Sequence, residues 1–170
     1  KPKFIYVVPD FQNPSGFTMS LERRRRLLEL AYKYEVPVLE DSPYRELRYT
    51  GQSVPAIYGL DTENQVMVLG TFSKLLCPGL RLAWMMAPTD WMDRLIVAKQ
   101  GMDLCPPTYT QLIAAEYMKL GLLPKHIETI RKIYGRKLQV MLNALNKYMP
   151  KGVTWSKPEG GLFLWVKLPG

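Results

Sequence analysis

The sequence predicts an α/β fold with a mainly parallel sheet, one antiparallel strand and flanking helices. A short apolar run at residues 4–8 is followed by a helical pattern at 20–34 and by a second apolar run at 36–39. A strand, a helix and a strand in this order favour a parallel pair joined by a right-handed crossover. Two further apolar runs, 66–69 and 80–87, are separated by only a short loop, so we expect them to be antiparallel neighbours.

Local signals place the boundaries of these elements. Ser20 is suited to cap the first helix, and Glu22 lies in its first turn, where the helix dipole favours an acid. Pro37 enforces extended structure after that helix. Residues 45–65 show little periodicity, and we interpret them as a loop-rich connection between the second and third strands.

The second half of the chain is predicted to be mostly helical. Helical patterns cover 91–100 and 108–120, and a long one covers 124–148. Strands are expected at 153–155 and 162–166. We therefore expect residues 1–148 to form the C-terminal part of a large domain ending in a long interdomain helix, and residues 149–170 to begin a small α+β domain.

Composition limits the class of protein. Of the 170 residues, 47% are hydrophobic and 22% are charged, which is typical of a globular chain. No apolar run reaches the roughly 20 residues that a membrane span needs, so a cytoplasmic location is expected. One histidine, His126, argues against a metal site or a histidine-centred triad, and a solvated position is expected for it. The chain starts on Lys1 without methionine and stops at Gly170, so we expect a piece of a longer polypeptide.

The net charge of +8 raises the possibility of an anionic partner. The densest basic patch, residues 23–26, falls in a helical pattern with apolar residues on the other side. This arrangement favours a solvated helix face over nucleic-acid binding, because no recognisable reading motif accompanies it.

The candidate nucleophile is Lys74, in the stretch that follows the third strand. A lysine held by a loop at the end of a buried strand can lose its proton and attack a carbonyl carbon, forming a Schiff base. The alternative is an ordinary surface lysine. Ser73 precedes Lys74, and Arg81 follows in the same stretch.

Polar side chains follow each of the first three strands. Asn13 comes after the first strand, Asp41 and Tyr44 after the second, and Ser73 with Lys74 after the third. The carboxyl ends of parallel strands form the ligand crevice of an open α/β sheet, so these groups could meet in one pocket. Taken singly, Asn13 could be a turn former, Asp41 a helix cap and Tyr44 a packed aromatic.

This set of side chains suits pyridoxal 5'-phosphate (PLP). A carboxylate beside the pyridine nitrogen keeps it protonated, an amide and a phenol can donate to the phenolic oxygen, and a lysine binds the aldehyde. A guanidinium and hydroxyls suit the phosphate. The sequence lacks the Gly-rich turn of a nicotinamide site and the Walker loop of a nucleotide triphosphate site.

Four motifs in order also resemble a known family. They are YVVPDFQNPSG at 6–16, DSPY at 41–44, SK at 73–74 with PGLR at 78–81, and PEGGLFLW at 158–165. Together they resemble the fold-type I, class I/II aminotransferases. The branch they resemble contains 2-aminoadipate and aromatic aminotransferases and the aminotransferase-like domains of MocR-type regulators.

The resemblance implies transamination between an amino acid and a 2-keto acid, in a homodimer, with PLP as cofactor. The amino donor displaces Lys74, whose amine then moves the α-proton to the cofactor. Family positions for the phosphate turn, the stacking aromatic ring and the substrate-binding arginine would lie outside this chain, so we expect the 170 residues alone to be inactive. The implied roles are Schiff-base lysine for Lys74, pyridinium partner for Asp41, phenolic-oxygen ligands for Asn13 and Tyr44, and phosphate ligands for Ser73 and Arg81.

Two other functions stay open. The fold could sense PLP in a regulator whose DNA-binding domain lies elsewhere, or it could belong to a PLP lyase or synthase that uses the same lysine and aspartate. Cys77 could indicate redox chemistry, but a small buried packing residue is the reading we favour.

Overall fold

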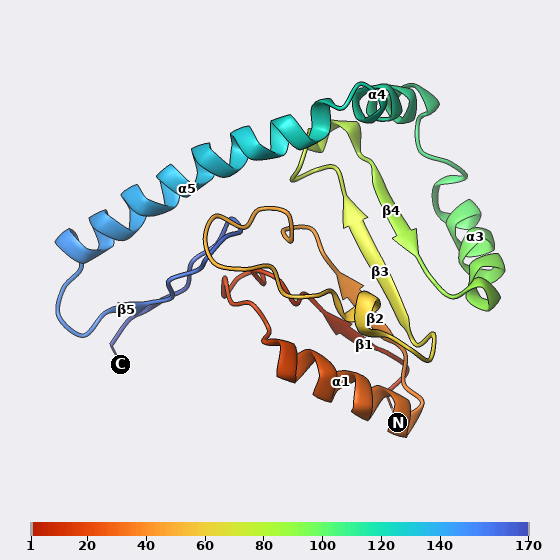
Figure 1. Cartoon of the computed structure of the whole chain (residues 1–170), viewed down its shortest axis with the longest axis horizontal. Coiled ribbons are helices and arrows are strands. Elements are labelled where there is room, and N and C mark those ends of the chain that lie inside the picture. Colours follow the sequence, from red (N-terminus) through yellow and green to blue (C-terminus); the bar gives the residue numbers. More distant parts are fainter. Residues whose placement is uncertain (1, 170) are drawn as a thin grey trace.

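A four-stranded sheet forms the centre of the molecule, and the computed structural model describes residues 2–169 (Figure 1). Its strands are β1 (Ile5–Val7), β2 (Val38–Asp41), β3 (Val66–Thr71) and β4 (Ala83–Met86), in that spatial order. β1, β2 and β3 are parallel, and β4 is antiparallel to β3. The predicted α/β sheet with one antiparallel strand is confirmed.

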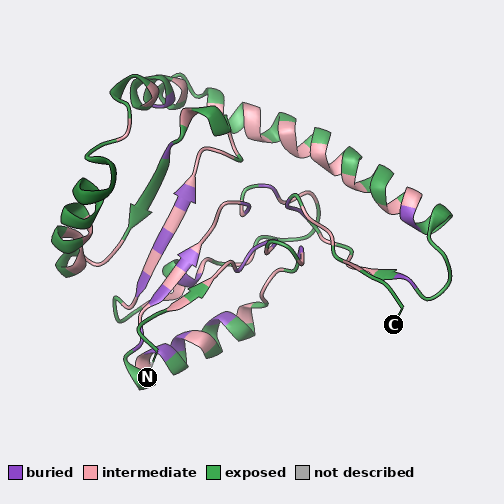
Figure 2. Cartoon of the chain, turned by 180° about the vertical axis from the view of Figure 1, so that it is seen from behind, coloured by how far each residue is buried: buried purple, intermediate pink, exposed green. Residues whose placement is uncertain are grey.

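The strand register assigns side chains to two faces. Val38 pairs with Ile5 and Val66, and these residues point to the face covered by α1 (Leu21–Tyr34) and the short helix α2 (Ile57–Leu60). Residues in the next register position point to the opposite face. Figure 2 shows buried residues alternating with less buried ones along β2 and β3. The core of the α1 face consists of Leu28, Ala31, Val38, Ile57 and Val66.

Helix α1 begins and ends as predicted. The Ser20 hydroxyl accepts a hydrogen bond from the Arg23 amide at 3.3 Å, so Ser20 is the N-cap. Glu35 ends the helix in the left-handed conformation, with φ of 50°. The Val36 amide still donates to the carbonyl of Ala31, which delays the second strand. β2 therefore starts at residue 38 instead of the predicted 36 and extends to 41.

The stretch predicted as a loop, 45–65, contains α2. The buried carboxylate of Glu40 accepts from the Tyr58 amide at 2.8 Å, and the buried side chain of Ile57 joins the core. One helical turn is thus fixed by tertiary contacts, which a search for periodicity cannot detect.

Three helices follow the sheet: α3 (Thr89–Asp103), α4 (Thr108–Lys119) and α5 (Leu122–Tyr148). α5 starts two residues before Pro124, because a proline in the first helical turn lacks only a hydrogen bond that is not made there. α5 runs from α4 towards the C-terminal strands (Figure 1). Within residues 2–169, none of the helices is both long enough and apolar enough to cross a membrane.

A small antiparallel sheet pairs β5 (Thr154–Trp155) with β6 (Val166–Lys167). The predicted strand at 162–166 is wrong for most of its length. The residues just before it bond elsewhere, since the Gly161 amide donates to the Leu47 carbonyl at 2.8 Å and Gly160 forms a bridge with Arg48. The chain between β5 and β6 is thereby held against the loop after β2.

A second apolar cluster lies beyond the carboxyl ends of the strands. Phe11, Tyr44 and Leu47 are buried there, and Phe163 and Tyr134 pack on them. This cluster joins the loops after β1 and β2 to α5 and to the segment after β5.

Candidate active site

Asp41 is the last residue of β2 and is bonded to the neighbouring strand. The hydroxyl of Tyr6 in β1 donates to Oδ2 of Asp41 at 2.5 Å. This hydrogen bond raises the pKa of Tyr6 to about 12, with smaller contributions from burial and from the negative charge of Asp41. Tyr6 pairs with Leu39, two residues before Asp41, so Tyr6 and Asp41 share the face opposite α1.

Tyr44 and Asn13 lie beside this pair. The Tyr44 side chain is buried, and its ring meets that of Phe163 edge-on with centroids 5.5 Å apart. Burial raises the pKa of Tyr44, a hydrogen bond with the Asn13 side chain acts in the opposite direction, and the charge of Asp41 raises it further. Three of the predicted site residues, Asn13, Asp41 and Tyr44, are therefore brought together.

The turn that carries Asn13 is tightly bonded. The side-chain oxygen of Gln12 accepts from the amide and hydroxyl of Ser15 at 3.1 and 2.5 Å, and the Gly16 amide donates to the Gln12 carbonyl at 2.7 Å. The Asn13–Pro14 peptide bond is cis. Gly16 has φ of 72°, and a Cβ there would lie 2.5 Å from the Phe163 carbonyl oxygen. The turn thus packs directly on the segment after β5.

A buried ion pair next to this turn was not predicted from the sequence. Arg24 is fully buried and donates to Oδ1 of Asp10 at 2.8 Å and to the Pro9 carbonyl at 3.1 Å. Its Nε also donates to the Met19 carbonyl at 3.0 Å. The prediction of a solvated face for residues 23–26 is therefore wrong at position 24. Helical spacing could have indicated that Arg24 is buried, since Arg24 lies four residues before Leu28 and seven before Ala31, both of which are in the core.

Ser73, Lys74 and Arg81 lie in the loop between β3 and β4. The Ser73 amide donates to the Thr71 hydroxyl oxygen at 3.1 Å, and that hydroxyl donates to the Leu82 carbonyl at 3.1 Å, closing the loop at its base. Arg81 has φ of 53°, and its Nη1 donates to the Pro78 carbonyl at 3.1 Å.

Lys74 lies three positions beyond the last residue of β3, the strand that neighbours β2. The Ser42 amide donates to the Leu69 carbonyl at 3.0 Å, so the chain after Asp41 stays attached to β3 as both strands reach the same edge of the sheet. Lys74 is exposed in this chain. The desolvation expected for its amine is therefore not provided by residues 2–169.

Two predictions about single residues need correction. Cys77 is exposed and is not a buried packing residue, whereas Leu75 in the same loop packs on the cluster of Phe11, Tyr44 and Leu47. His126 is half-buried instead of solvated, and its ring meets that of Tyr117 edge-on with centroids 6.4 Å apart.

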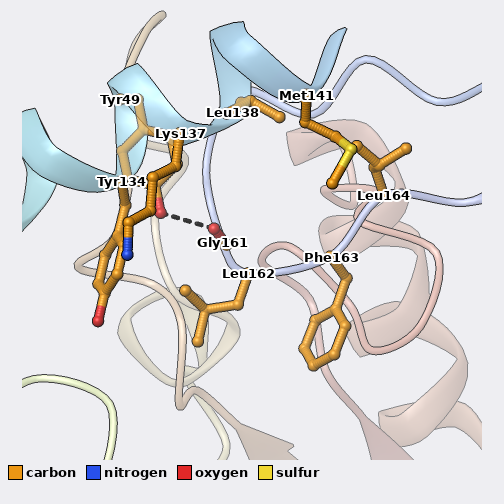
Figure 3. Close-up of a pocket in the computed structure, with 9 residues that line it drawn as sticks. All are labelled: Tyr49, Tyr134, Lys137, Leu138, Met141, Gly161, Leu162, Phe163 and Leu164. Carbon is orange, nitrogen blue, oxygen red and sulfur yellow. Dashed lines mark hydrogen bonds between the residues drawn. The ribbon is translucent and has the colours of Figure 1, made fainter. Parts of the chain in front are cut away.

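A cavity of about 460 Å³ lies between α5 and residues 161–164. Figure 3 shows Lys137 and Met141 of α5 above Leu162 and Phe163, with the Tyr49 hydroxyl donating to the Gly161 carbonyl at 2.6 Å. None of the predicted site residues lines this cavity. It is distinct from the cluster around Asp41.

The residues at this edge of the sheet fit PLP. Tyr6 occupies one oxygen of Asp41, and a carboxylate has a second oxygen that can accept from a protonated ring nitrogen. Tyr44 and Asn13 supply a phenol and an amide that already interact beside Asp41. Ser73, Lys74 and Arg81 supply a hydroxyl, an amine and a guanidinium from the next loop, which is the donor set that an aldehyde and a phosphate need.

The chain belongs to the family "Aminotransferase class I and II", whose model matches residues 2–170. It is 49% identical over 169 residues to aromatic-amino-acid aminotransferase 1 of Thermococcus litoralis, covering 99% of this chain and 40% of that one. It is 40% identical over 172 residues to 2-aminoadipate transaminase of Thermus thermophilus, covering 99% and 43%.

The fold agrees with that assignment. The structure superposes on the kynurenine aminotransferase of Pyrococcus horikoshii, crystallised with PMP, with a TM-score of 0.97 and 49% identity, covering 100% of this chain and 42% of that one. HTH-type transcriptional regulators are also among the relatives. The chain spans about 40% of the length of the aminotransferases that it matches. The resemblance seen in the four motifs is confirmed, and PLP is the cofactor that these findings indicate.

Proposed function

We propose that the parent polypeptide is an aminotransferase that moves an amino group from an amino acid to a 2-keto acid with Lys74 as its covalent cofactor anchor. The observation that carries this is the cluster of Asn13, Asp41 and Tyr44 at the edge of the sheet where β3 leads into Lys74. When bound, PLP supplies the electron sink that makes the α-proton of the amino acid acidic.

Each of the chain's own residues has a proposed task. The Asp41 carboxylate keeps the ring nitrogen protonated, and Asn13 and Tyr44 hold the phenolic oxygen. Lys74 would hold the aldehyde, and its amine would move the proton at the substrate α-carbon. Ser73 and Arg81 bind the phosphate. Because one pocket holds both the base and the reacting carbon, the proton transfer is effectively intramolecular.

The activity belongs to the longer protein, since this chain spans about 40% of the length of its relatives. We assign residues 1–148 to the PLP-binding large domain and 149–170 to the start of the small domain. We infer that the 170 residues alone do not turn over amino acids, and that the intact enzyme is a cytoplasmic homodimer. Turnover by the purified 170-residue chain would contradict the first of these inferences.

The decisive experiment replaces the proposed anchor. Lys74→Ala in the full-length protein should abolish the visible absorption of covalently bound PLP and the transfer of an amino group. Lys119→Ala is the matched control, because Lys119 is an exposed lysine at the end of α4. If the Lys74→Ala protein keeps the visible band, the anchor is another amine.

A regulator is the second candidate, and the HTH-type relatives are the observation that favours it. Incubating the full-length protein with an amino donor and 2-oxoglutarate separates the two candidates. Glutamate formation identifies an aminotransferase. PLP binding without glutamate formation, together with binding to a DNA fragment, identifies a regulator.

A further inference from the structure

Tyr6 is the one residue of β1 whose side chain bonds to a proposed cofactor ligand among the described residues. It lies on the strand next to Asp41, displaced by two positions in register, and its hydroxyl donates to Oδ2 at 2.5 Å. Cross-strand diagonal neighbours of this kind are within reach of a long aromatic side chain.

The carboxyl group of an aspartate turns easily about its last side-chain bond, because that torsion has a broad energy profile. A hydrogen bond to one oxygen removes this freedom and fixes where the other oxygen points. Tyr6 makes such a bond to Oδ2 of Asp41, which leaves Oδ1 to accept from another donor.

We propose that Tyr6 is a positioning residue, which orients the Asp41 carboxylate so that its second oxygen meets the protonated ring nitrogen of PLP. This inference rests on the proposed function, because it assigns Asp41 to that nitrogen. Tyr6 acts through Asp41 and does not itself contact the reacting atoms.

Two properties of Tyr6 support this role. Its pKa is raised to about 12, chiefly by the hydrogen bond to Asp41, which means that this bond favours the protonated form of the hydroxyl, the form that donates. Its ring is not part of the core around Leu28 and Val38, and 55% of the residue is exposed in this chain. A residue that served only to stabilise the sheet would not need a hydroxyl at this position.

The test uses Tyr6→Phe in the full-length protein, since this change removes only the hydroxyl. The dissociation constant for PLP should rise about tenfold, because one hydrogen bond to a charged group is lost. The absorption maximum of the bound cofactor should also shift, as the ring nitrogen meets a differently oriented carboxylate. The cofactor-free protein should unfold at a slightly lower urea concentration than the wild type at neutral pH, because the hydrogen bond to Asp41 itself contributes some stability.

A double-mutant cycle separates positioning from a merely structural role. In the Asp41→Ala background, Tyr6→Phe should change the dissociation constant by less than about twofold, since the residue through which Tyr6 acts is gone. Tyr34→Phe is the matched control, because Tyr34 has the same exposed fraction as Tyr6 and lies in α1. It should leave both the affinity and the spectrum unchanged.

The possible outcomes are distinct. If the wild-type protein binds no PLP, the proposed function fails and this inference fails with it. If the wild type binds PLP and Tyr6→Phe behaves like Tyr34→Phe, only the positioning role is overturned. A tenfold loss that persists in the Asp41→Ala background also overturns it, because Tyr6 would then act independently of Asp41.

Discussion

The guanidinium of Arg24 and the carboxylate of Asp10 form a buried ion pair, with Nη2 and Oδ1 2.8 Å apart. Asp10 immediately precedes the turn that carries Asn13, and Arg24 lies in the first half of α1. The pair therefore links the helix on one face of the sheet to the loop that delivers a proposed cofactor ligand. The same guanidinium also donates to the carbonyls of Pro9 and Pro55 at 3.1 and 3.0 Å.

Replacing Arg24 should be strongly destabilising. Arg24→Met leaves the Asp10 carboxylate buried, with Arg45, 3.6 Å away, as its remaining cationic partner among residues 2–169. Breaking a buried pair by removing one partner costs about 3–5 kcal/mol of unfolding free energy. Urea unfolding of the full-length, cofactor-free protein measures this loss.

The control for that substitution is Arg26→Met on the same helix. Arg26 pairs with Glu29 across one helical turn at 2.7 Å, and both side chains are more than half exposed. Exposed pairs contribute about 0–1 kcal/mol, so the unfolding midpoint should barely move. Equal losses for the two variants would show that the Arg24–Asp10 pair does not stabilise the fold.

The topology of the sheet and the polar residues at its edge could be predicted from the sequence for a physical reason. Apolar runs such as 66–69 must pair in the interior, and the short loop at Lys74 forces the next strand back antiparallel, so topology follows from run length and spacing. Asn13, Asp41 and Tyr44 could be placed together because each lies at or beyond the carboxyl end of a parallel strand.

The features that could not be predicted depend on contacts between distant segments, and such contacts leave no periodic signal in the sequence. The helix α2 forms because Glu40 binds its first turn, and the chain after β5 leaves the expected strand because Gly160 and Gly161 bond to the loop at Leu47. The Tyr6–Asp41 bond joins residues 35 positions apart, and only the register of β1 on β2 brings them together.

Gly160 lies in the chain between β5 and β6, and a substitution there tests how that chain is held against the loop after β2. A Cβ at position 160 would lie 2.3 Å from the Leu47 carbonyl oxygen and 2.5 Å from the ring of Phe11. Gly160→Ala should therefore force the segment away from the buried cluster and reduce the unfolding free energy by about 1–3 kcal/mol. Thermal or urea unfolding of the full-length protein measures the effect.

Gly59→Ala is the matched control for Gly160→Ala. Position 59 lies in α2, and a Cβ there would meet no atom within 4 Å. Alanine is favoured over glycine inside a helix by about 0.5–1 kcal/mol, so this variant should be as stable as the wild type or slightly more so. If Gly160→Ala is equally well tolerated, the close approach to Leu47 and Phe11 is not a constraint on the fold.

The ionisation of Tyr6 gives a pH-dependent test of its bond to Asp41. The pKa of Tyr6 is raised from 10.0 to about 12, chiefly by that hydrogen bond. Because the folded state holds the proton more tightly than the unfolded chain, this contribution to stability is complete below about pH 10 and is lost as the pH rises through about 12. Wild-type protein should therefore lose more stability over that interval than Tyr6→Phe, whereas Tyr34→Phe should behave as wild type.

Asp41→Asn tests the same Tyr6–Asp41 hydrogen bond by changing its acceptor. The neutral amide removes the charge and weakens the acceptor, so the pKa of Tyr6 should fall from about 12 back towards its ordinary value of 10.0. Ultraviolet titration of phenolate formation, with the Tyr6→Phe curve subtracted to isolate this residue, follows the change in the full-length protein. If the Tyr6 titration is the same with aspartate and asparagine at position 41, the carboxylate does not hold the hydroxyl, and the positioning role loses its physical basis.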